Sequence, residues 1–213
     1  MTALGVTRSE LILGGQRSGK SRRAEALAMA WLAQSAEHRA VFIATAQAWD
    51  DEMLERIARH RRDRADRVPC MLTVEEPLQL AQAMHAHGGP DTLLVIDCLT
   101  LWLTNALMRA TDLAEPADPN AGNDPEFKQK VPETLDTPAQ IAMVLGAIRD
   151  APGPVVLVSN EIGLGVIPLG REVRAFVDAL GRLNQDVAQA CQRVTLMVAG
   201  VPVPIKNIAG KAS

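Results

Sequence analysis

The sequence predicts an α/β fold in three layers, with a mostly parallel central sheet and helices on both faces. Two observations lead to this prediction. Short, continuous apolar runs recur along the chain, as at residues 40–44, 93–96 and 154–158, and such runs are typical of strands that are buried on both faces. Helix-forming stretches separate them, so strand and helix alternate as a parallel sheet covered on both sides requires.

Each expected element follows from its own residues. The acidic start at Asp50 suits a helix dipole, and Pro77 is placed in the first turn of its helix. Pro202 and Pro204 cannot donate ladder hydrogen bonds, so the last strand is expected at an edge, with a tail from Asn207. Strands are expected at residues 11–13, 40–44, 71–74, 92–97, 154–159 and 194–199, the last closing the sheet, and helices at 21–34, 50–64, 77–85, 99–108, 139–150 and 171–192.

Residues 111–138 depart from this alternation. Proline, glycine and many Asp, Glu and Asn residues break any periodicity there, which predicts a mostly irregular excursion. It is too long for an ordinary connection between elements. A lid, an interface segment and a disordered surface insertion are all compatible with it, and its composition is most typical of the last.

Composition bounds the function. The 213 residues, 47% of them hydrophobic, fit one domain over residues 1–213. A net charge of −3 and 3% aromatic residues disfavour a nucleic-acid partner. No apolar run reaches the roughly 20 residues of a membrane span, and residues 1–10 do not resemble a secretory signal. Three widely spaced cysteines form no disulfide framework, so a reduced, cytoplasmic setting is expected.

The most informative stretch is residues 14–21, Gly-Gly-Gln-Arg-Ser-Gly-Lys-Ser. It fits the pattern G-x-x-x-x-G-K-[ST] of the Walker A phosphate loop. An apolar run at 11–13 precedes it and a helix-forming run follows it, which is the context that such a loop needs. The sequence therefore predicts a P-loop fold of the RecA-like kind and a nucleoside triphosphate as ligand.

The residues of this loop have separate expected roles. Gly14, Gly15 and Gly19 permit backbone angles that a Cβ would obstruct, so that successive N–H groups can wrap the phosphates. Lys20 is expected to reach the terminal phosphates, and the Ser21 hydroxyl to bind Mg²⁺. The helix that follows adds the positive end of its dipole.

Two further strands end in polar residues. Asp97 follows the run 93–96, where a P-loop enzyme places a carboxylate on Mg²⁺ or on a Mg²⁺-bound water, although such an Asp can instead cap the helix that begins at Leu99. Asn160 and Glu161 follow another apolar strand, at the edge where open α/β sheets bind ligands. Either could position a substrate, and turn chemistry explains the pair equally well.

His60 is the candidate nucleophile. It lies in a helical stretch with five arginines, which suit a polyphosphate and disfavour imidazolium, leaving a neutral nitrogen available. Charge runs are usually solvated helix faces, so the residues alone leave both interpretations open. The arginines are Arg56, Arg59, Arg61, Arg62 and Arg64; His38, His85 and His87 are expected to be structural or solvated.

Several motifs together resemble one family, the bifunctional adenosylcobinamide kinase / adenosylcobinamide-phosphate guanylyltransferases. The resemblance covers nearly the whole chain except residues 1–9, the excursion at 111–138 and the tail. The motifs are Gly14-Gly15-Gln16-Arg17-Ser18-Gly19-Lys20-Ser21, Ile43-Ala44-Thr45-Ala46 with Asp50-Asp51-Glu52-Met53 and Arg56 to Arg64, Thr73-Val74-Glu75-Glu76, Asp97-Cys98-Leu99-Thr100 with Thr104-Asn105, Val158-Ser159-Asn160-Glu161-Ile162-Gly163, Gly181-Arg182-Leu183-Asn184-Gln185 and Gly200-Val201-Pro202.

The resemblance implies a two-step enzyme of cobalamin assembly. ATP or GTP phosphorylates the aminopropanol hydroxyl of adenosylcobinamide. GMP from GTP is then joined to that phosphate, releasing pyrophosphate and giving adenosylcobinamide-GDP. The family carries GMP on a histidine, and His60 matches that position. The family also implies a homotrimer with the nucleotide site near a subunit boundary.

Site residues follow from the same resemblance. His60 and Lys20 are the expected catalytic residues, and Ser21 and Asp97 the expected Mg²⁺ ligands. The expected nucleotide contacts are Gly14, Gly15, Gln16, Arg17, Ser18, Gly19, Lys20, Ser21, Ala44, Thr45, Ala46, Arg61, Arg62, Asp63, Arg64, Glu75 and Asp97.

Two other functions remain open at this point. One is a P-loop kinase for another small metabolite, in which His60 is an ordinary phosphate contact. The other is a non-enzymatic nucleotide-binding switch or assembly protein. The chain has no NKxD-type guanine-reading motif, which argues against a regulatory GTPase.

Overall fold

The computed structural model describes residues 4–48, 51–114 and 136–207. Its elements follow one another in the order β1 (Ser9–Gly14), α1 (Lys20–Leu32), β2 (Arg39–Ala44), α2 (Asp51–Arg67), β3 (Leu72–Glu75), α3 (Leu80–His87), β4 (Thr92–Asp97), α4 (Leu99–Ala114), α5 (Thr137–Asp150), β5 (Val155–Val158), α6 (Arg171–Ala190), β6 (Arg193–Val198) and β7 (Val201–Asn207). The strand–helix alternation that the sequence predicts is confirmed.

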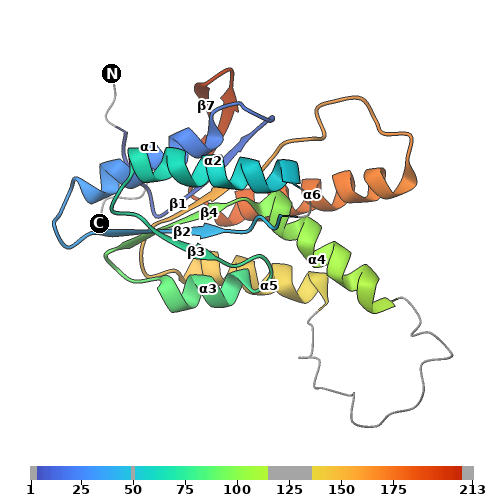
Figure 1. Cartoon of the computed structure of the whole chain (residues 1–213), viewed down its shortest axis with the longest axis horizontal. Helices are drawn as coiled ribbons and strands as arrows, with labels where there is room; N and C mark the ends of the chain where they lie inside the picture. Colours follow the sequence, from blue (N-terminus) through green and yellow to red (C-terminus); the bar gives the residue numbers. More distant parts are fainter. Residues whose placement is uncertain (1–3, 49–50, 115–135, 208–213) are drawn as a thin grey trace, which may run out of the picture.

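The described strands form one seven-stranded sheet in the order β3-β2-β4-β5-β1-β6-β7 (Figure 1). All neighbouring pairs run parallel except β6 and β7, which run antiparallel. The phosphate-loop strand β1 and the Asp97 strand β4 are both internal and are separated by β5. The prediction of a mostly parallel α/β sheet consistent with a P-loop fold is correct.

Helices cover both faces of the sheet, because alternate residues of each strand point to opposite sides. Leu11 and Leu13 of β1 join a core that includes residues of α3, α4, α5 and α6. Ile12 joins the other core, with Leu27 of α1 and with Val68, which follows α2 directly. Figure 1 shows α1 and α2 on one side of the sheet and α3 and α5 on the other. The parallel strands therefore all end at one edge between these layers.

Two sequence predictions about the elements are wrong. Pro77 does not start a helix: the Glu76 carboxylate accepts hydrogen bonds from the N–H groups of Leu78 and Gln79 at 2.9 and 2.7 Å, which makes a turn, and α3 begins only at Leu80. The strand β6 does not close the sheet, because the chain reverses at Ala199-Gly200 and adds β7 outside it. Asn207 belongs to that strand, not to a tail.

The predicted edge position of the proline-containing strand is confirmed. In β7, Pro202 and Pro204 pair with Met197 and Thr195 of β6, and the other side of β7 has no neighbouring strand among the described residues. An edge position leaves one side of β7 without a ladder, which is where a strand tolerates proline.

The predicted excursion at 111–138 is shorter than the sequence suggested. Helix α4 continues to Ala114, and α5 already begins at Thr137, where the Asp136 carboxylate caps it by accepting from Ala139 N at 3.0 Å. The remainder, residues 115–135, lies outside the described residues. In the part of the chain that the structure describes, no helix is long and apolar enough to cross a membrane.

Candidate active site

The loop between β1 and α1 has the tight backbone that its glycines predict. Gly14 has a φ of 152°, and a Cβ there would lie 2.6 Å from Ser18 Oγ and 2.7 Å from the Met197 carbonyl oxygen. Gly19, with a φ of 99°, precedes the first residue of α1. At Gly15 the conformation does not require glycine, because its φ is not positive and a Cβ would have no atom within 4 Å. Arg17, with a φ of 56°, adopts the third positive angle instead.

Lys20 lies inside the loop that it is expected to serve. Its buried Nζ donates to the carbonyl oxygens of Gly14 at 3.0 Å and Gly15 at 2.7 Å. The Ser18 hydroxyl is also buried, and among the described residues it has no hydrogen-bond partner. A buried, unsatisfied hydroxyl costs free energy, and a phosphate oxygen in the loop would remove that cost. The loop therefore holds a cation and a donor ready for an anionic ligand.

Ser21 and Asp97 meet across the sheet edge. The Ser21 hydroxyl donates to Asp97 Oδ2 at 3.5 Å, so the first turn of α1 and the end of β4 face each other. This contact brings Asp97 beside the phosphate loop. One hydroxyl and one carboxylate fit Mg²⁺, which prefers oxygen ligands and usually keeps waters and phosphate oxygens in its remaining positions.

Basic side chains from two helices lie close to the Asp97 carboxyl. Burial raises the pKa of the Asp97 carboxyl, and the nearby basic side chains of His60, Arg64 and Lys20 oppose that rise. These three side chains come from two helices that are far apart in the sequence, α2 and α1. The structure thus brings the proposed nucleophile His60 and the loop lysine around one carboxylate.

Thr45 forms hydrogen bonds to the backbone of Asp97 and Cys98, at the end of β4. It is fully buried, and its hydroxyl exchanges hydrogen bonds of 2.8 Å with the carbonyl and N–H of Cys98. Its own N–H donates to the Asp97 carbonyl at 3.1 Å, and Asn105 donates to its carbonyl at 2.8 Å. All its polar groups are therefore engaged within the protein. The structure gives Thr45 a part in holding the end of β4.

Helix α2 is anchored by its C-terminal turns. Arg64 is buried and lies over the Phe42 ring at 3.8 Å from the ring centroid, with Nη2 donating to Thr73 Oγ1 at 3.4 Å. Arg67 pairs with the buried Glu25 of α1 at 2.7 Å. Burial lowers the pKa of Arg64, and the carboxylates of Asp97 and Glu25 partly offset this. These contacts fix the helix that carries His60 against the sheet.

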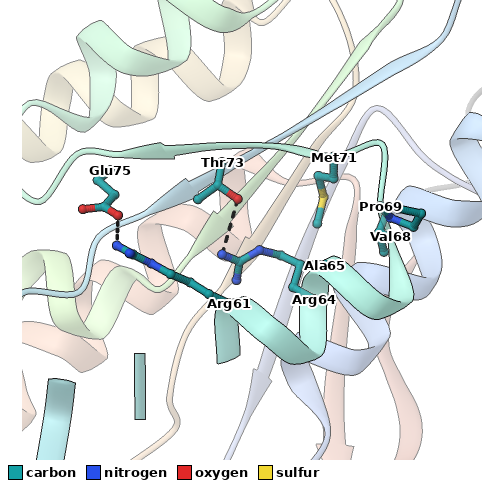
Figure 2. A pocket seen from close by; sticks show the side chains of 8 residues that line it. All are labelled: Arg61, Arg64, Ala65, Val68, Pro69, Met71, Thr73 and Glu75. Atoms are coloured by element: carbon teal, nitrogen blue, oxygen red, sulfur yellow. Dashed lines mark hydrogen bonds and ion pairs between the residues drawn. The ribbon is translucent and has the colours of Figure 1, made fainter. Parts of the chain in front are cut away.

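A pocket of about 280 Å³ opens between the end of α2 and the edge strand β3. Figure 2 shows Arg61 and Arg64 reaching from the helix toward Glu75 and Thr73 of the strand. Arg61 and Glu75 form an ion pair, and both side chains are more than half exposed. Paired donors and acceptors at a pocket wall suit the sugar and base of a nucleotide. The pocket is further lined by Ala65, Val68, Pro69 and Met71.

Other predicted contacts lie at the margin of the site. Asp63 faces Arg67 at 3.5 Å, and Arg62 is exposed. Gln16 and Arg17 are exposed at the tip of the loop. Ala44 and Ala46 flank Thr45 at the end of β2, where the Ala44 carbonyl accepts from Glu76 N at 2.9 Å. Of the predicted site residues, the phosphate loop, His60 and Arg64 are therefore the ones that lie around Asp97.

Sequence reasoning missed the polar network beside the loop. Thr100, Ser159 and Asn184 are buried and are linked by hydrogen bonds to one another and to Asn160. The position of Asn160 after an apolar strand was a usable signal. Asn184 stands in the middle of α6, and its helical spacing from Leu180 and Val187, which places it on the apolar face, was the available hint.

Comparison with known proteins gives one consistent result. A family model described as cobinamide kinase / cobinamide phosphate guanyltransferase matches residues 10–205. The bifunctional adenosylcobalamin biosynthesis protein CobP of Pseudomonas aeruginosa is 44% identical over 199 residues, which cover 93% of this chain and 97% of that protein. The bifunctional adenosylcobalamin biosynthesis protein CobU of Escherichia coli K12 is 37% identical over 196 residues, or 92% and 98% of the two chains, and that of Salmonella typhimurium is 35% identical.

Proposed function

The chain belongs to the cobinamide kinase / cobinamide phosphate guanyltransferase family and is an enzyme of cobalamin biosynthesis, and we propose that the site around Asp97 performs both of its reactions. Membership sets aside the two other functions that the sequence left open, a kinase for another metabolite and a non-enzymatic assembly protein. We further propose that residues 1–213 form one P-loop domain, since the described helices all pack on one sheet.

In the kinase step, the aminopropanol hydroxyl of adenosylcobinamide attacks the γ-phosphorus of ATP or GTP. The new P–O bond forms as the bond to the β-phosphate oxygen breaks, and the hydroxyl proton is released. Lys20 moves from the loop carbonyls to the terminal phosphates, where its charge stabilises the transferring group. The loop N–H groups and the Ser18 hydroxyl hold the remaining phosphate oxygens.

In the guanylyl step, a neutral ring nitrogen of His60 attacks the α-phosphorus of GTP. A P–N bond forms, and pyrophosphate leaves. A phosphate oxygen of adenosylcobinamide phosphate then attacks the same phosphorus, the P–N bond breaks, and adenosylcobinamide-GDP is released. Arg64 and Lys20 supply positive charge near the imidazole, and Arg61 and Glu75 lie at the wall of the pocket that would hold the nucleoside.

Ser21 and Asp97 would hold Mg²⁺ in this arrangement. The ion, when bound, neutralises phosphate charge. Two protein oxygens leave room for the water and phosphate ligands that Mg²⁺ prefers.

One observation carries the proposal for the guanylyl step. The side chain of His60, from α2, lies near enough to the Asp97 carboxyl to interact with it electrostatically, as does the loop lysine. A solvated helix face would not bring an imidazole and the phosphate loop around one carboxylate.

The test is the complete reaction. The enzyme is incubated with adenosylcobinamide, ATP and GTP, and the corrinoid products are followed by mass spectrometry. Adenosylcobinamide phosphate is expected first and adenosylcobinamide-GDP second, and His60→Ala is expected to stop at the phosphate. Formation of the GDP product by His60→Ala at the wild-type rate would contradict the histidine role.

We also propose that the enzyme is a homotrimer, as the family resemblance implies. Two apolar surfaces support an assembly: the loop at 162–169, where Val166 and Leu169 are 96% and 97% exposed, and the edge strand β7 with Ile205. Light scattering coupled to size exclusion should give three times the mass of one chain, 22.9 kDa. A monomeric mass at micromolar concentration would contradict the trimer.

A further inference from the structure

Asn160 occupies the gap between the two strands that carry the phosphate-binding residues. The strand β5 lies between β1 and β4, and its last residue, Val158, pairs with Ile12 of β1 and with Asp97 of β4. Asn160 therefore follows two residues beyond the level of Asp97. At this edge of a parallel sheet, ligands bind beyond the carboxyl ends of the strands.

Three elements hold Asn160 in place. From α4, Thr100 Oγ1 accepts from the Asn160 backbone N–H at 2.9 Å and from its side-chain Nδ2 at 3.2 Å. From α6, Asn184 Nδ2 donates to the Asn160 carbonyl at 3.0 Å. On the third side, the N–H of Glu161 donates to the Gly14 carbonyl at 3.2 Å. Both the backbone and the side chain of Asn160 are thus fixed.

The last of these contacts ties Asn160 to the catalytic lysine. The same Gly14 carbonyl oxygen accepts from Lys20 Nζ at 3.0 Å. The peptide N–H that follows Asn160 and the ammonium expected to grip the terminal phosphates therefore share one acceptor. Asn160 is therefore one residue away from a direct backbone contact with the first residue of the phosphate loop.

The network behind Asn160 is built of buried polar groups. Asn184 is 4% exposed, and its Oδ1 accepts from the hydroxyl of Ser159, which is fully buried, at 2.7 Å. Thr100 Oγ1 lies 3.5 Å from that hydroxyl. Burying three polar side chains is costly unless each is bonded, and a fully bonded buried network holds its members in one geometry. The group that they fix is Asn160.

The carboxamide of Asn160 keeps hydrogen-bonding capacity after these contacts. Its Nδ2 carries two N–H groups, of which one serves the Thr100 hydroxyl. In an Asx-turn the side chain would bond the backbone nearby in sequence, whereas the Asn160 amide bonds the Thr100 hydroxyl of another element, so turn chemistry does not explain this contact. We propose that Asn160 donates its second amide N–H to a γ-phosphate oxygen in the kinase step, and that Asn184 and Thr100 are positioning residues that orient it.

The geometry assigns this contact to one of the two reactions. Arg64 and the pocket lie toward β2 and β3, on one side of Asp97, whereas Asn160 lies between β4 and β1, on the other side. The α-phosphorus that His60 attacks and the γ-phosphorus of the kinase step would then have different neighbours. Asn160 should therefore matter much more to phosphorylation, in which the γ-phosphate is the transferring group, than to guanylylation, in which it is only the far end of the leaving pyrophosphate. This assignment rests on the phosphate-loop placement proposed above.

The experiment measures the two half-reactions separately in Asn160→Ala. With γ-labelled ATP and adenosylcobinamide, kcat of the kinase step is expected to fall about 10- to 100-fold, with KM for adenosylcobinamide little changed, because the lost contact acts on the transferring group. With α-labelled GTP, the rate of protein labelling is expected to stay within about twofold of wild type. Replacing a γ-phosphate oxygen by sulfur should slow the wild-type enzyme more than Asn160→Ala. The variant has already lost the amide hydrogen bond that the sulfur would weaken.

Matched variants separate this role from a structural one. Thr100→Val removes the hydroxyl that orients the amide, and Thr100→Ser keeps it, so only the former should reproduce the kinase defect. Thr195→Val is a second control, because it loses a buried hydrogen bond to Glu10, away from the loop. A structural effect would lower both half-reactions and the melting temperature in all of these variants.

The outcomes distinguish this inference from the proposed function. If Lys20→Ala loses the kinase step but Asn160→Ala has wild-type kcat, the loop is correctly placed and the Asn160 contact is wrong. Equal losses of phosphorylation and guanylylation in Asn160→Ala would also overturn it. If Lys20→Ala itself keeps the wild-type kinase rate, the proposed binding of the triphosphate in the loop is wrong, and the Asn160 contact is rejected with it.

Discussion

The two halves of the site are built in opposite ways. The phosphate-loop half uses residues 14–21, close together in sequence, in which Ser18 and Lys20 are buried and Gly14, Arg17 and Gly19 adopt positive φ angles. The α2 half carries His60 on a helix that is held by a stacked arginine and by ion pairs, partly exposed to solvent. The proposed phosphate site is thus specified locally, whereas the proposed nucleophile depends on contacts between distant elements.

The largest expected effect comes from the loop half. Lys20→Ala should slow the kinase step about 10²–10³-fold, because the charge that stabilises the transferring phosphoryl group is lost. Guanylyl transfer should also fall, since the proposal places the triphosphate of both reactions in the same loop. Steady-state assays of each half-reaction measure this. A variant that loses one reaction and keeps the other would mean that the two reactions use separate nucleotide sites.

A stability comparison tests the sheet under the two halves. Ile96→Ala, at a fully buried position just before Asp97, should lower the free energy of unfolding by about 2–5 kcal/mol. Leu72→Ala, in the edge strand β3 beside the pocket, should cost much less, because Leu72 is 56% exposed. Urea unfolding monitored by circular dichroism provides both values. Similar costs would contradict the different burial of the two strands.

Two arginines of α2 should also differ. Arg64→Ala should lower stability by about 1–2 kcal/mol, since Arg64 is buried over Phe42 and bonded to Thr73. Arg61→Ala removes an exposed ion pair with Glu75, which is worth about 0–1 kcal/mol. Its main effect should be a higher KM for GTP. A larger stability loss in Arg61→Ala than in Arg64→Ala would reverse the assignment of anchor and ligand contact.

The smallest expected effect is on the rate at which a cysteine beside the pocket reacts with a thiol reagent. Cys70 is exposed between two pocket residues, whereas burial raises the pKa of Cys98 to about 11 and of Cys191 to about 12. At about pH 8 the two buried thiols stay protonated, so a disulfide reagent should modify Cys70 quickly and the others slowly.

GTP should slow the modification of Cys70 a few-fold if the pocket holds the nucleoside. Cys70→Ser is the control, because it should abolish the rapid phase. An unchanged rate with saturating GTP would argue that the nucleoside binds elsewhere.

The contrast between the halves also explains what the sequence could predict. The loop, its glycines at 14 and 19, and Asp97 at the end of a strand were accessible because their signals are local. His60 required the family resemblance, since an arginine-rich helix face has the same composition whether it is solvated or catalytic. Its proximity to Asp97 is visible only once α2 folds back over the sheet.

Other features depended on tertiary contacts. Thr45 was predicted to contact nucleotide, yet its polar groups hold the end of β4. The prolines of β7 predicted that it is an edge strand. The sequence did not predict that the chain turns at Gly200 and that β7 pairs antiparallel with β6. Asn184 is surrounded by a helical pattern, and its partner Ser159 lies 25 residues away in sequence. Such pairings have no local signature.

The central claim is that His60 receives GMP from a nucleotide held by the phosphate loop. Incubation with α-labelled GTP should transfer one label to each chain, and the adduct should be labile in acid and stable in alkali, as a P–N bond is. The label should be absent from His60→Ala and present in His85→Ala, an exposed histidine on the opposite face. A label that persists in His60→Ala, or no label in the wild-type enzyme, would contradict the claim.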